Sequence, residues 1–174
     1  MEVEFEKTYL LEKIPEEIDS CDNEEITDIY LPSTAEHPIL RIRKRDQNYE
    51  IIKKTPINEK DSSEQEEQII ILSQEEFKAL TRNTEGKTLK KKRYYLPAKG
   101  RTAEVDLFAE KLKGLGLVDF EFDSREEKKN FEKPDFCLAE VTQEKFIAGG
   151  MLAGKKYSDI KGKLKQYSYK KLNY

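Results

Sequence analysis

Charged and apolar residues alternate one by one along several short stretches of this chain. Leu40-Arg41-Ile42-Arg43 and Asp119-Phe120-Glu121-Phe122 are the clearest examples. Successive side chains of a β-strand point to opposite faces, so each stretch would have one charged face and one apolar face. A helix would instead place its apolar residues three or four positions apart. The alternation therefore predicts a protein built mainly of half-buried β-strands.

Turn residues and capping patterns divide the chain further. Ser73 with Glu76, and Ser124 with Glu127, have the spacing of helix capping boxes, so a helix is expected after each serine. We predict a polar loop over 56–63 and a helical basic tail over 155–174. The predicted strands are 2–10, 27–31, 39–45, 49–54, 64–72, 88–96, 101–108 and 117–123. This pattern favours an α+β fold, an eight-stranded antiparallel β-barrel with helices packed outside, in a single domain over 1–174.

The two signs of charge are separated by strand. Glu4 and Glu6 share one face of the first strand, and Asp119 and Glu121 share one face of the last. The basic faces belong to two other strands and carry Arg41 and Arg43, and Lys91 and Arg93. For any one strand, a solvated outer face explains the charges equally well. Rows of like charge repel, however, so the whole set indicates a ligand lying between the strands.

The residue types indicate what that ligand is. Arginine and lysine side chains converging from several strands suit a chain of phosphate groups. Carboxylates spaced Glu-x-Glu are hard oxygen ligands for Mg²⁺ or Mn²⁺. A metal ion bridging carboxylates and phosphate oxygens is the usual arrangement for phosphoryl transfer. The chain has no glycine-rich phosphate loop, so we expect side chains to hold the phosphates.

Composition bears on the partners and the compartment. The chain has 32 Lys and Arg against 35 Asp and Glu, a net charge of -3, which predicts no specific nucleic-acid partner. Its two cysteines do not form a disulfide framework, and no apolar run reaches the roughly 20 residues that span a bilayer. We therefore expect a cytoplasmic protein without a membrane partner. The sequence leaves open whether the chain forms a homodimer.

The order of these motifs resembles the CYTH domain, or triphosphate tunnel metalloenzyme, superfamily. Glu4 and Glu6 resemble its opening Glu-x-Glu strand, and Leu40 to Arg43 its Arg-x-Arg strand. Further along, Tyr49 to Lys54, Glu64 to Glu67, Lys91 to Arg93, Asp106, Leu117 to Phe122 and a closing segment from Pro134 to Ala153 follow in the family's order. The likeness runs from residue 2 to about residue 153.

The resemblance implies a role for each matching residue. Glu4, Glu6 and Glu121 would bind Mg²⁺ or Mn²⁺, with Asp119 next to them. For a triphosphatase, Glu4, Glu6, Glu66 and Lys54 would be the catalytic residues, and either a second metal ion or a carboxylate such as Glu66 would position the attacking water molecule. The phosphate-binding residues would be Arg41, Arg43, Lys54, Lys91 and Arg93.

One position departs from the family pattern. The opening strand of the family continues with a lysine where this chain has Thr8, and Lys7 lies on the opposite face by strand parity. Two interpretations of Thr8 stay open: it donates a hydrogen bond while another lysine compensates, or catalysis is weakened, altered or lost while binding persists. His37, the only histidine, is expected to be a surface residue, and Cys137 a small packed one.

Three functions fit the pattern. The first is a metal-dependent triphosphatase acting on tripolyphosphate, a nucleoside triphosphate or thiamine triphosphate. The second is an adenylyl cyclase that makes cyclic AMP from ATP. The third, motivated by Thr8, is a binding protein for polyphosphate or nucleotide that has no catalytic activity.

Overall fold

The computed structural model describes the backbone of residues 2–174 and the side chains of residues 3–174. Its strands are β1 (Glu2–Leu11), β2 (Asn23–Leu31), β3 (Leu40–Arg45), β4 (Asn48–Asn58), β5 (Asp61–Leu72), β6 (Lys87–Ala98), β7 (Arg101–Phe108), β8 (Gly116–Phe122) and β9 (Cys137–Glu140). The α-helices are α1 (Gln74–Thr81), α2 (Arg125–Asn130), α3 (Gly149–Leu152) and α4 (Tyr157–Leu164). The short 3-10 helices within residues 2–174 are η1 (Ile18–Ser20), η2 (Glu110–Leu112), η3 (Lys145–Ile147) and η4 (Lys165–Tyr167).

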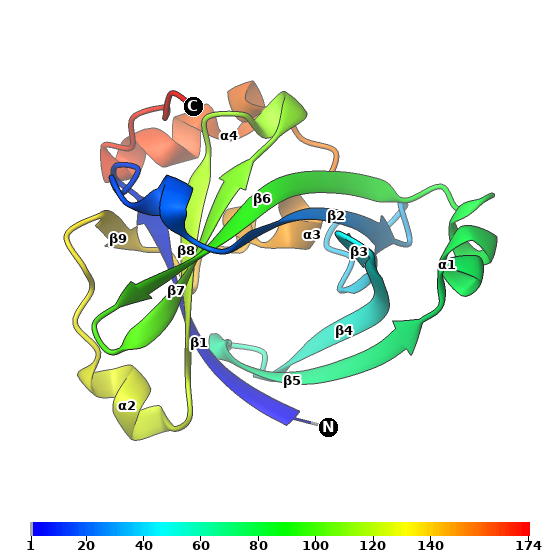
Figure 1. Ribbon diagram of the computed structural model, residues 1–174, viewed down its shortest axis with the longest axis horizontal. Coiled ribbons are helices and arrows are strands. Elements are labelled where there is room, and N and C mark those ends of the chain that lie inside the picture. Colours follow the sequence, from blue (N-terminus) through cyan, green and yellow to red (C-terminus); the bar gives the residue numbers. More distant parts are fainter. Residues whose placement is uncertain (1) are drawn as a thin grey trace.

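The strands close into an antiparallel barrel (Figure 1). Their order is β5-β4-β3-β2-β6-β7-β8-β1, and β5 pairs with β1 to complete the ring. The short strand β9 adds to the far half of β1, beyond the residues that pair with β5. The predicted fold class, an eight-stranded antiparallel barrel with outer helices, is confirmed.

Two-residue turns join three of the hairpins and fix which side chains face inward. Arg45 pairs with Asn48, Asn58 with Asp61, and Ala98 with Arg101. In the last turn Lys99 and Gly100 both have positive φ, the backbone twist that suits a tight hairpin. Because a turn of fixed length sets the register, every second residue of each strand is committed to one face.

The predicted polar loop over 56–63 is wrong. β4 continues through Pro56 to Asn58, and β5 begins at Asp61. Pro56 has no amide proton, yet it lies past the point where β3 stops pairing with β4, so one edge of β4 is free there. Polarity alone suggested a loop, although both faces of this hairpin tolerate polar residues.

The apolar faces of half the barrel point outward. Tyr9, Val105, Val118 and Phe120 form a buried cluster outside β1, β7 and β8, which Phe131 and other peripheral residues cover. α2, which precedes Phe131, is capped at its N-terminus by Ser124, whose hydroxyl oxygen accepts from Glu127 N at 3.2 Å. β1, β7 and β8 therefore bury apolar side chains against outer segments, while charged side chains of the same strands, such as Glu6, Asp106 and Asp119, line the interior.

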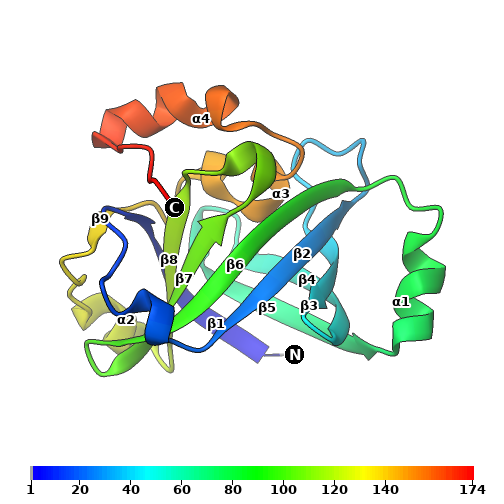
Figure 2. The ribbon, with the colours of Figure 1, turned by 45° about the horizontal axis from the view of Figure 1, so that its top comes forward.

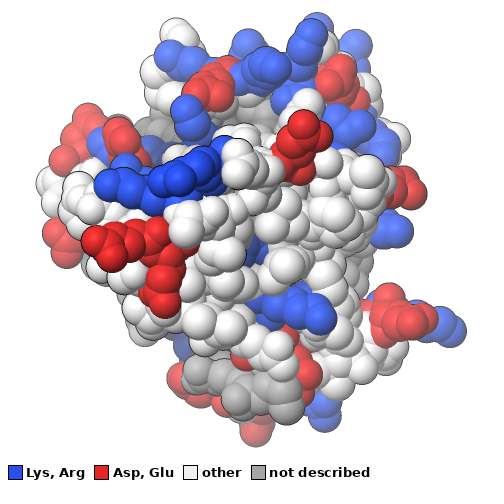
Figure 3. All heavy atoms as spheres, turned by 90° about the vertical axis from the view of Figure 1, so that its right-hand side faces the viewer, with Lys and Arg blue, Asp and Glu red and all other residues white. Residues whose placement is uncertain are grey.

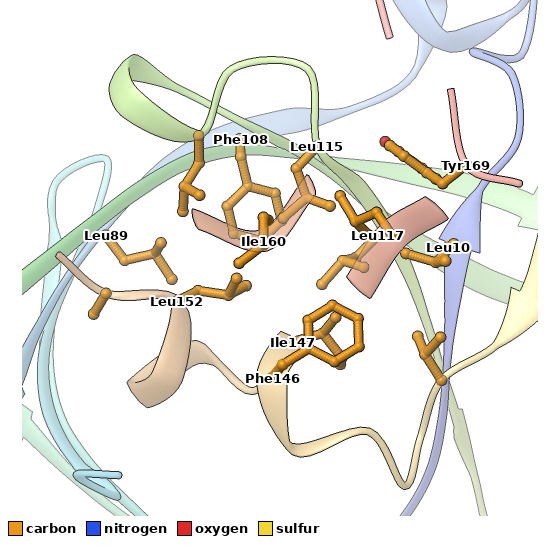
Figure 4. Close-up of a cluster of buried hydrophobic side chains, with 14 of the residues drawn as sticks. Leu10, Leu89, Phe108, Leu115, Leu117, Phe146, Ile147, Leu152, Ile160 and Tyr169 are labelled. Atoms are coloured by element: carbon orange, nitrogen blue, oxygen red, sulfur yellow. The ribbon is translucent and has the colours of Figure 1, made fainter. Parts of the chain in front are cut away.

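Helices cover one end of the barrel (Figure 2). A second apolar cluster lies there, and Figure 4 shows Leu117 and Phe108 of the barrel facing Phe146, Leu152 and Ile160 of the covering segments. The backbones approach closely: a Cβ on Gly150 would lie 2.0 Å from the carbonyl oxygen of Pro38. Residues 145–152 thus close this end of the barrel, and we call them the plug. Where Gly150 of the plug meets Pro38, there is no room for a side chain.

The basic tail packs on the same end. Ile160, Leu164 and Tyr169 join the second apolar cluster, while the lysines of the tail stay exposed. Lys and Arg atoms gather along the top of Figure 3, where α4 lies in Figure 1. Tyr169 Oη accepts from Gly116 N at 2.8 Å and donates to Gly114 O at 2.9 Å, which fixes the tail to the β7–β8 connection. No helix among residues 2–174 is long and apolar enough to span a membrane.

Candidate active site

The inner faces of the strands enclose a cavity of about 470 Å³, a size typical of small-molecule sites. The acidic residues that line it are Glu4, Glu6, Glu67, Glu104, Asp106, Asp119, Glu121 and Glu144. The basic residues that line it are Arg41, Arg43, Arg45, Lys54, Lys91, Arg93 and Lys145. Of the site residues predicted from the sequence, all but one line this cavity.

Glu66 is the exception. Its neighbours Gln65 and Glu67 line the cavity, so strand parity turns Glu66 to the outside. The structure thereby corrects the prediction that Glu66 positions a water molecule in the site. The run from Glu64 to Glu67 is polar at every position, so its sequence does not indicate which residues face inward.

Lys54 lies at the centre of a carboxylate cluster. Its Nζ donates to Glu4 Oε2, and lies 3.5 Å from Glu6 Oε2 and 3.6 Å from Glu67 Oε1. Gln65 Nε2 donates to the other oxygen of Glu6 at 2.6 Å. Burial alone would lower the pKa of Lys54, but the Glu6 and Glu4 carboxylates outweigh it and raise that pKa. Lys54 therefore stays charged.

Two arginines are oriented by buried aspartates. Arg43 donates from Nε and Nη2 to the two carboxylate oxygens of Asp28, at 2.6 and 2.8 Å. Arg93 donates in the same way to Asp106, at 2.7 Å to each oxygen. A bidentate pair fixes the plane of a guanidinium group. Both aspartates are only 1% exposed, so each arginine is held in one orientation within the cavity.

Asp28 was not predicted as part of the site. It lies on β2, and although burial would raise its pKa, the charge of Arg43 outweighs burial and lowers it. The sequence signal is an aspartate between apolar and hydroxyl-bearing side chains, in Thr27-Asp28-Ile29-Tyr30. A buried carboxylate requires a cationic partner, but the sequence alone does not say which one.

Two other arginines keep unused donors. Arg41 Nη1 donates to Tyr30 Oη at 3.1 Å, and Arg45 Nη2 donates to Glu50 Oε1 at 2.9 Å. The Nε atoms of Arg41 and Arg45 are buried and have no hydrogen-bond partner within the described part of the chain. A buried donor without an acceptor is costly, and a phosphate oxygen in the cavity would satisfy it.

Thr8 lies in the cavity beside the acidic strand β8. Its hydroxyl donates to Asp119 Oδ1 at 2.6 Å, and Arg93 Nη2 lies 3.5 Å from Asp119 Oδ2. Burial raises the pKa of Asp119, and the negative charge of Asp106 raises it further. Lys7 is turned away from the cavity, where its Nζ lies 3.3 Å from Glu140 Oε2. Lys7 therefore does not supply the cation that Thr8 lacks.

The acidic residues fit a divalent metal by their chemistry. Glu4, Glu6 and Glu121 offer oxygen ligands from the adjacent strands β1 and β8. Burial, and after it the charges of Glu104 and Glu4, raises the pKa of Glu121 to about 7. Carboxylates that destabilise one another in this way are stabilised when a cation binds. Among the described side chains, no three His, Cys, Asp or Glu already form a metal-binding group.

The plugged end adds residues that the sequence did not indicate. His37 and Thr142 line the cavity, together with Lys145 and Gly150 of the plug. His37 was expected to be a surface residue, but it is half-buried, and burial followed by the charge of Lys145 lowers its pKa. Cys137 lies outside the cavity in the outer apolar cluster, fully buried, as predicted.

Solved structures provide the comparisons. An inorganic triphosphatase is 27% identical with a TM-score of 0.64, covering 89% of this chain and 97% of that one. A conserved hypothetical protein from Pyrococcus furiosus is 27% identical with a TM-score of 0.50, covering 72% and 83%. A Bacillus halodurans protein provisionally assigned as an adenylate cyclase is 15% identical with a TM-score of 0.56, covering 99% and 94%, and shares the fold. No sequence profile of a known family and no curated protein matches the chain.

Proposed function

We propose that this chain, which resembles the CYTH or triphosphate tunnel metalloenzyme superfamily in sequence and in fold, is a metal-dependent triphosphatase. The observation that carries the proposal is a single cavity in which basic side chains from β3, β4 and β6 face acidic side chains from β1 and β8. A triphosphate bound to its metal ion carries negative and positive charge together, so it matches both the basic and the acidic side chains of the cavity. The likeness to an inorganic triphosphatase at 27% identity supports the same activity.

The basic residues bind and orient the phosphate chain. Arg41 and Arg45 each have a buried Nε that finds no partner among the described residues, which suits a phosphate oxygen. Asp28 and Asp106 hold Arg43 and Arg93 in fixed orientations, so these guanidinium groups do not reorganise as charge develops on the transferring phosphoryl group. Lys91, which lies on β6 with Arg93 and donates to Asp106, adds a further positive charge to the cavity.

The acidic residues would hold the metal. Glu4, Glu6 and Glu121 would bind Mg²⁺ or Mn²⁺, with Asp119 beside them. The bound ion supplies Lewis-acid polarisation of the phosphoryl oxygens. The closed barrel wall limits the access of bulk water, so charge interactions inside are stronger than on a surface. The substrates we propose are tripolyphosphate, longer polyphosphate, and nucleoside or thiamine triphosphate.

One observation favours a second function, binding without turnover. Thr8 fills a cavity position beside Asp119 with a hydroxyl group, and no lysine replaces it from β1. A site of this kind would bind a triphosphate through β3, β4 and β6 while the cleavage step is slow. Tight binding in calorimetry together with absent turnover is the expected signature.

Phosphate release tests the main proposal. Tripolyphosphate, ATP and thiamine triphosphate are each assayed with Mg²⁺ and with Mn²⁺, and products are separated so that cyclic AMP and pyrophosphate would reveal a cyclase. We expect phosphate release that Glu4→Gln reduces at least about a hundredfold. Glu66→Gln is the matched control because Glu66 lies on β5 outside the cavity, and its activity should equal wild type. Absent release from every triphosphate would refute the triphosphatase.

A further inference from the structure

We propose that Lys54 acts as a built-in cation that a divalent metal displaces, so that metal entry releases Lys54 to bind phosphate. This inference rests on the proposed function and adds an order of binding to it. The geometry behind it is the convergence of one ammonium group and three carboxylates inside the barrel, where Lys54 Nζ meets Glu4, Glu6 and Glu67. Two of those carboxylates are proposed metal ligands.

The ammonium group and a metal compete for the same oxygens. Glu4 Oε2 accepts from Lys54, and Gln65 already occupies the other side of Glu6 through Oε1. A small divalent cation needs its oxygen ligands at about 2.0–2.2 Å. An ammonium nitrogen held by the same oxygens lies within the space the ion would take. Metal binding to Glu4 and Glu6 therefore requires Lys54 to move.

Glu67 gives Lys54 a place to move to. Glu67 Oε1 lies 3.6 Å from Lys54 Nζ and 4.0 Å from Arg41 Nη2. Lys54 is opposite Glu67 across the β4–β5 ladder, so it keeps this contact without any backbone change. Released from Glu4, the ammonium group would lie between Glu67 and Arg41, among the donors proposed to bind phosphate. The side chains of Lys54 and Glu67 are 20% and 13% exposed, so water only partly compensates the charges in either position.

A functional order follows from this exchange. Without metal, Lys54 neutralises the carboxylates and is unavailable to phosphate. With metal bound, the carboxylates are neutralised by the ion and Lys54 joins Arg41. The metal ion should therefore bind first. It should strengthen triphosphate binding in two ways, by contacting the phosphates directly and by releasing Lys54 to bind them.

Mn²⁺ binding without any triphosphate tests the exchange. Isothermal titration calorimetry is carried out on the whole chain, wild type against Lys54→Met and Lys54→Gln. Removing the competing ammonium group should tighten Mn²⁺ binding at least about fivefold. Far-ultraviolet circular dichroism establishes that each variant is folded, and the Gln variant replaces the Met variant if the latter fails to fold.

Two controls separate competition from a general change in charge. Lys91→Met also removes a cation from the cavity wall, but Lys91 donates to Asp106 rather than to Glu4 or Glu6. Lys53→Met removes an exposed cation from the neighbouring position of β4. Both should change Mn²⁺ affinity less than about twofold. If Lys91→Met tightens binding as much as Lys54→Met, or if neither Lys54 variant tightens it, the exchange is refuted.

The outcomes also separate this inference from the proposed function. Tighter Mn²⁺ binding in the Lys54 variants with no hydrolysis of any triphosphate would retain the exchange and refute the triphosphatase. Hydrolysis by wild type with unchanged Mn²⁺ binding in the Lys54 variants would retain the triphosphatase and refute the exchange. A crystal structure with Mn²⁺ gives a direct readout: Lys54 Nζ should lie beyond the roughly 4 Å limit of an ion pair with Glu4.

Discussion

At the scale of single residues, Thr8 occupies the cavity position at which the family that the sequence resembles has a lysine. Its hydroxyl donates to Asp119, whose other oxygen lies 3.5 Å from Arg93. Asp119 thus lies between the neutral hydroxyl group of Thr8 and the cationic Arg93. A cation at this position would both neutralise Asp119 and add a charge near the transferring phosphoryl group.

We predict that Thr8→Lys raises kcat/KM for triphosphate hydrolysis about tenfold, equivalent to about 1.4 kcal/mol of transition-state stabilisation. Thr8 lines the cavity of about 470 Å³, so the longer side chain would extend into it. Steady-state phosphate release measures the effect. Thr8→Val, which keeps the size of the residue and removes the hydroxyl, should show no gain. An unchanged kcat/KM in Thr8→Lys would mean that this position does not limit catalysis.

At the scale of elements, the plug over 145–152 depends on close backbone contact with the β2–β3 connection. A Cβ on Gly150 would lie 2.0 Å from the Pro38 carbonyl oxygen, a backbone atom that cannot rotate away. Gly162 in α4 has nothing within 4 Å of the same added atom. The two glycines therefore differ in what an alanine would encounter.

We predict that Gly150→Ala destabilises the protein by about 1–3 kcal/mol, because the plug must shift to relieve the overlap. Gly162→Ala should stabilise it by about 0.5–1 kcal/mol, since alanine loses less conformational freedom in a helix. Urea unfolding monitored by circular dichroism measures both. Equal stability of the two variants would contradict the close contact between plug and barrel.

The elements also show what the sequence could predict and what it could not. Alternation placed Glu4, Arg43 and Glu121 on inner faces, because each lies in a strand where apolar and charged residues take turns. It failed for Glu66, since a polar neighbour on either side leaves the parity undetermined. The sequence also did not predict the last residues of β4 or the first residues of β5. Their composition is polar, and it is the pairing between the two strands that extends them to a two-residue turn.

At the scale of the whole molecule, the barrel is stable with charges inside because most of them are paired. Asp106 accepts from Arg93 and Lys91 and is 1% exposed. Asp28 is equally buried against Arg43. The apolar faces of β1, β7 and β8 are meanwhile buried outside the ring. The fold therefore depends on ionised aspartates that the alternation pattern did not link to their partners.

This dependence predicts the response of the protein to acid. Burial alone would raise the pKa of Asp106, but the charges of Arg93 and Lys91 outweigh it and hold that pKa at about 2, below its ordinary value of 3.8. A carboxyl group whose pKa is lower in the folded state adds stability above its unfolded pKa and loses it as the pH falls. The contribution of Asp106, about 2 kcal/mol, should be complete above about pH 4 and disappear as the pH falls through 2.

Asp106→Asn isolates this contribution. The variant leaves Arg93 and Lys91 without their buried carboxylate, which should cost about 3–5 kcal/mol at pH 7. Because the asparagine does not titrate, the difference in unfolding free energy between wild type and variant should shrink by about 2 kcal/mol between pH 5 and pH 2. Urea unfolding at a series of pH values measures that difference. If the difference in unfolding free energy stays constant over this pH range, the Asp106 ion pair is not what makes the folded barrel sensitive to acid.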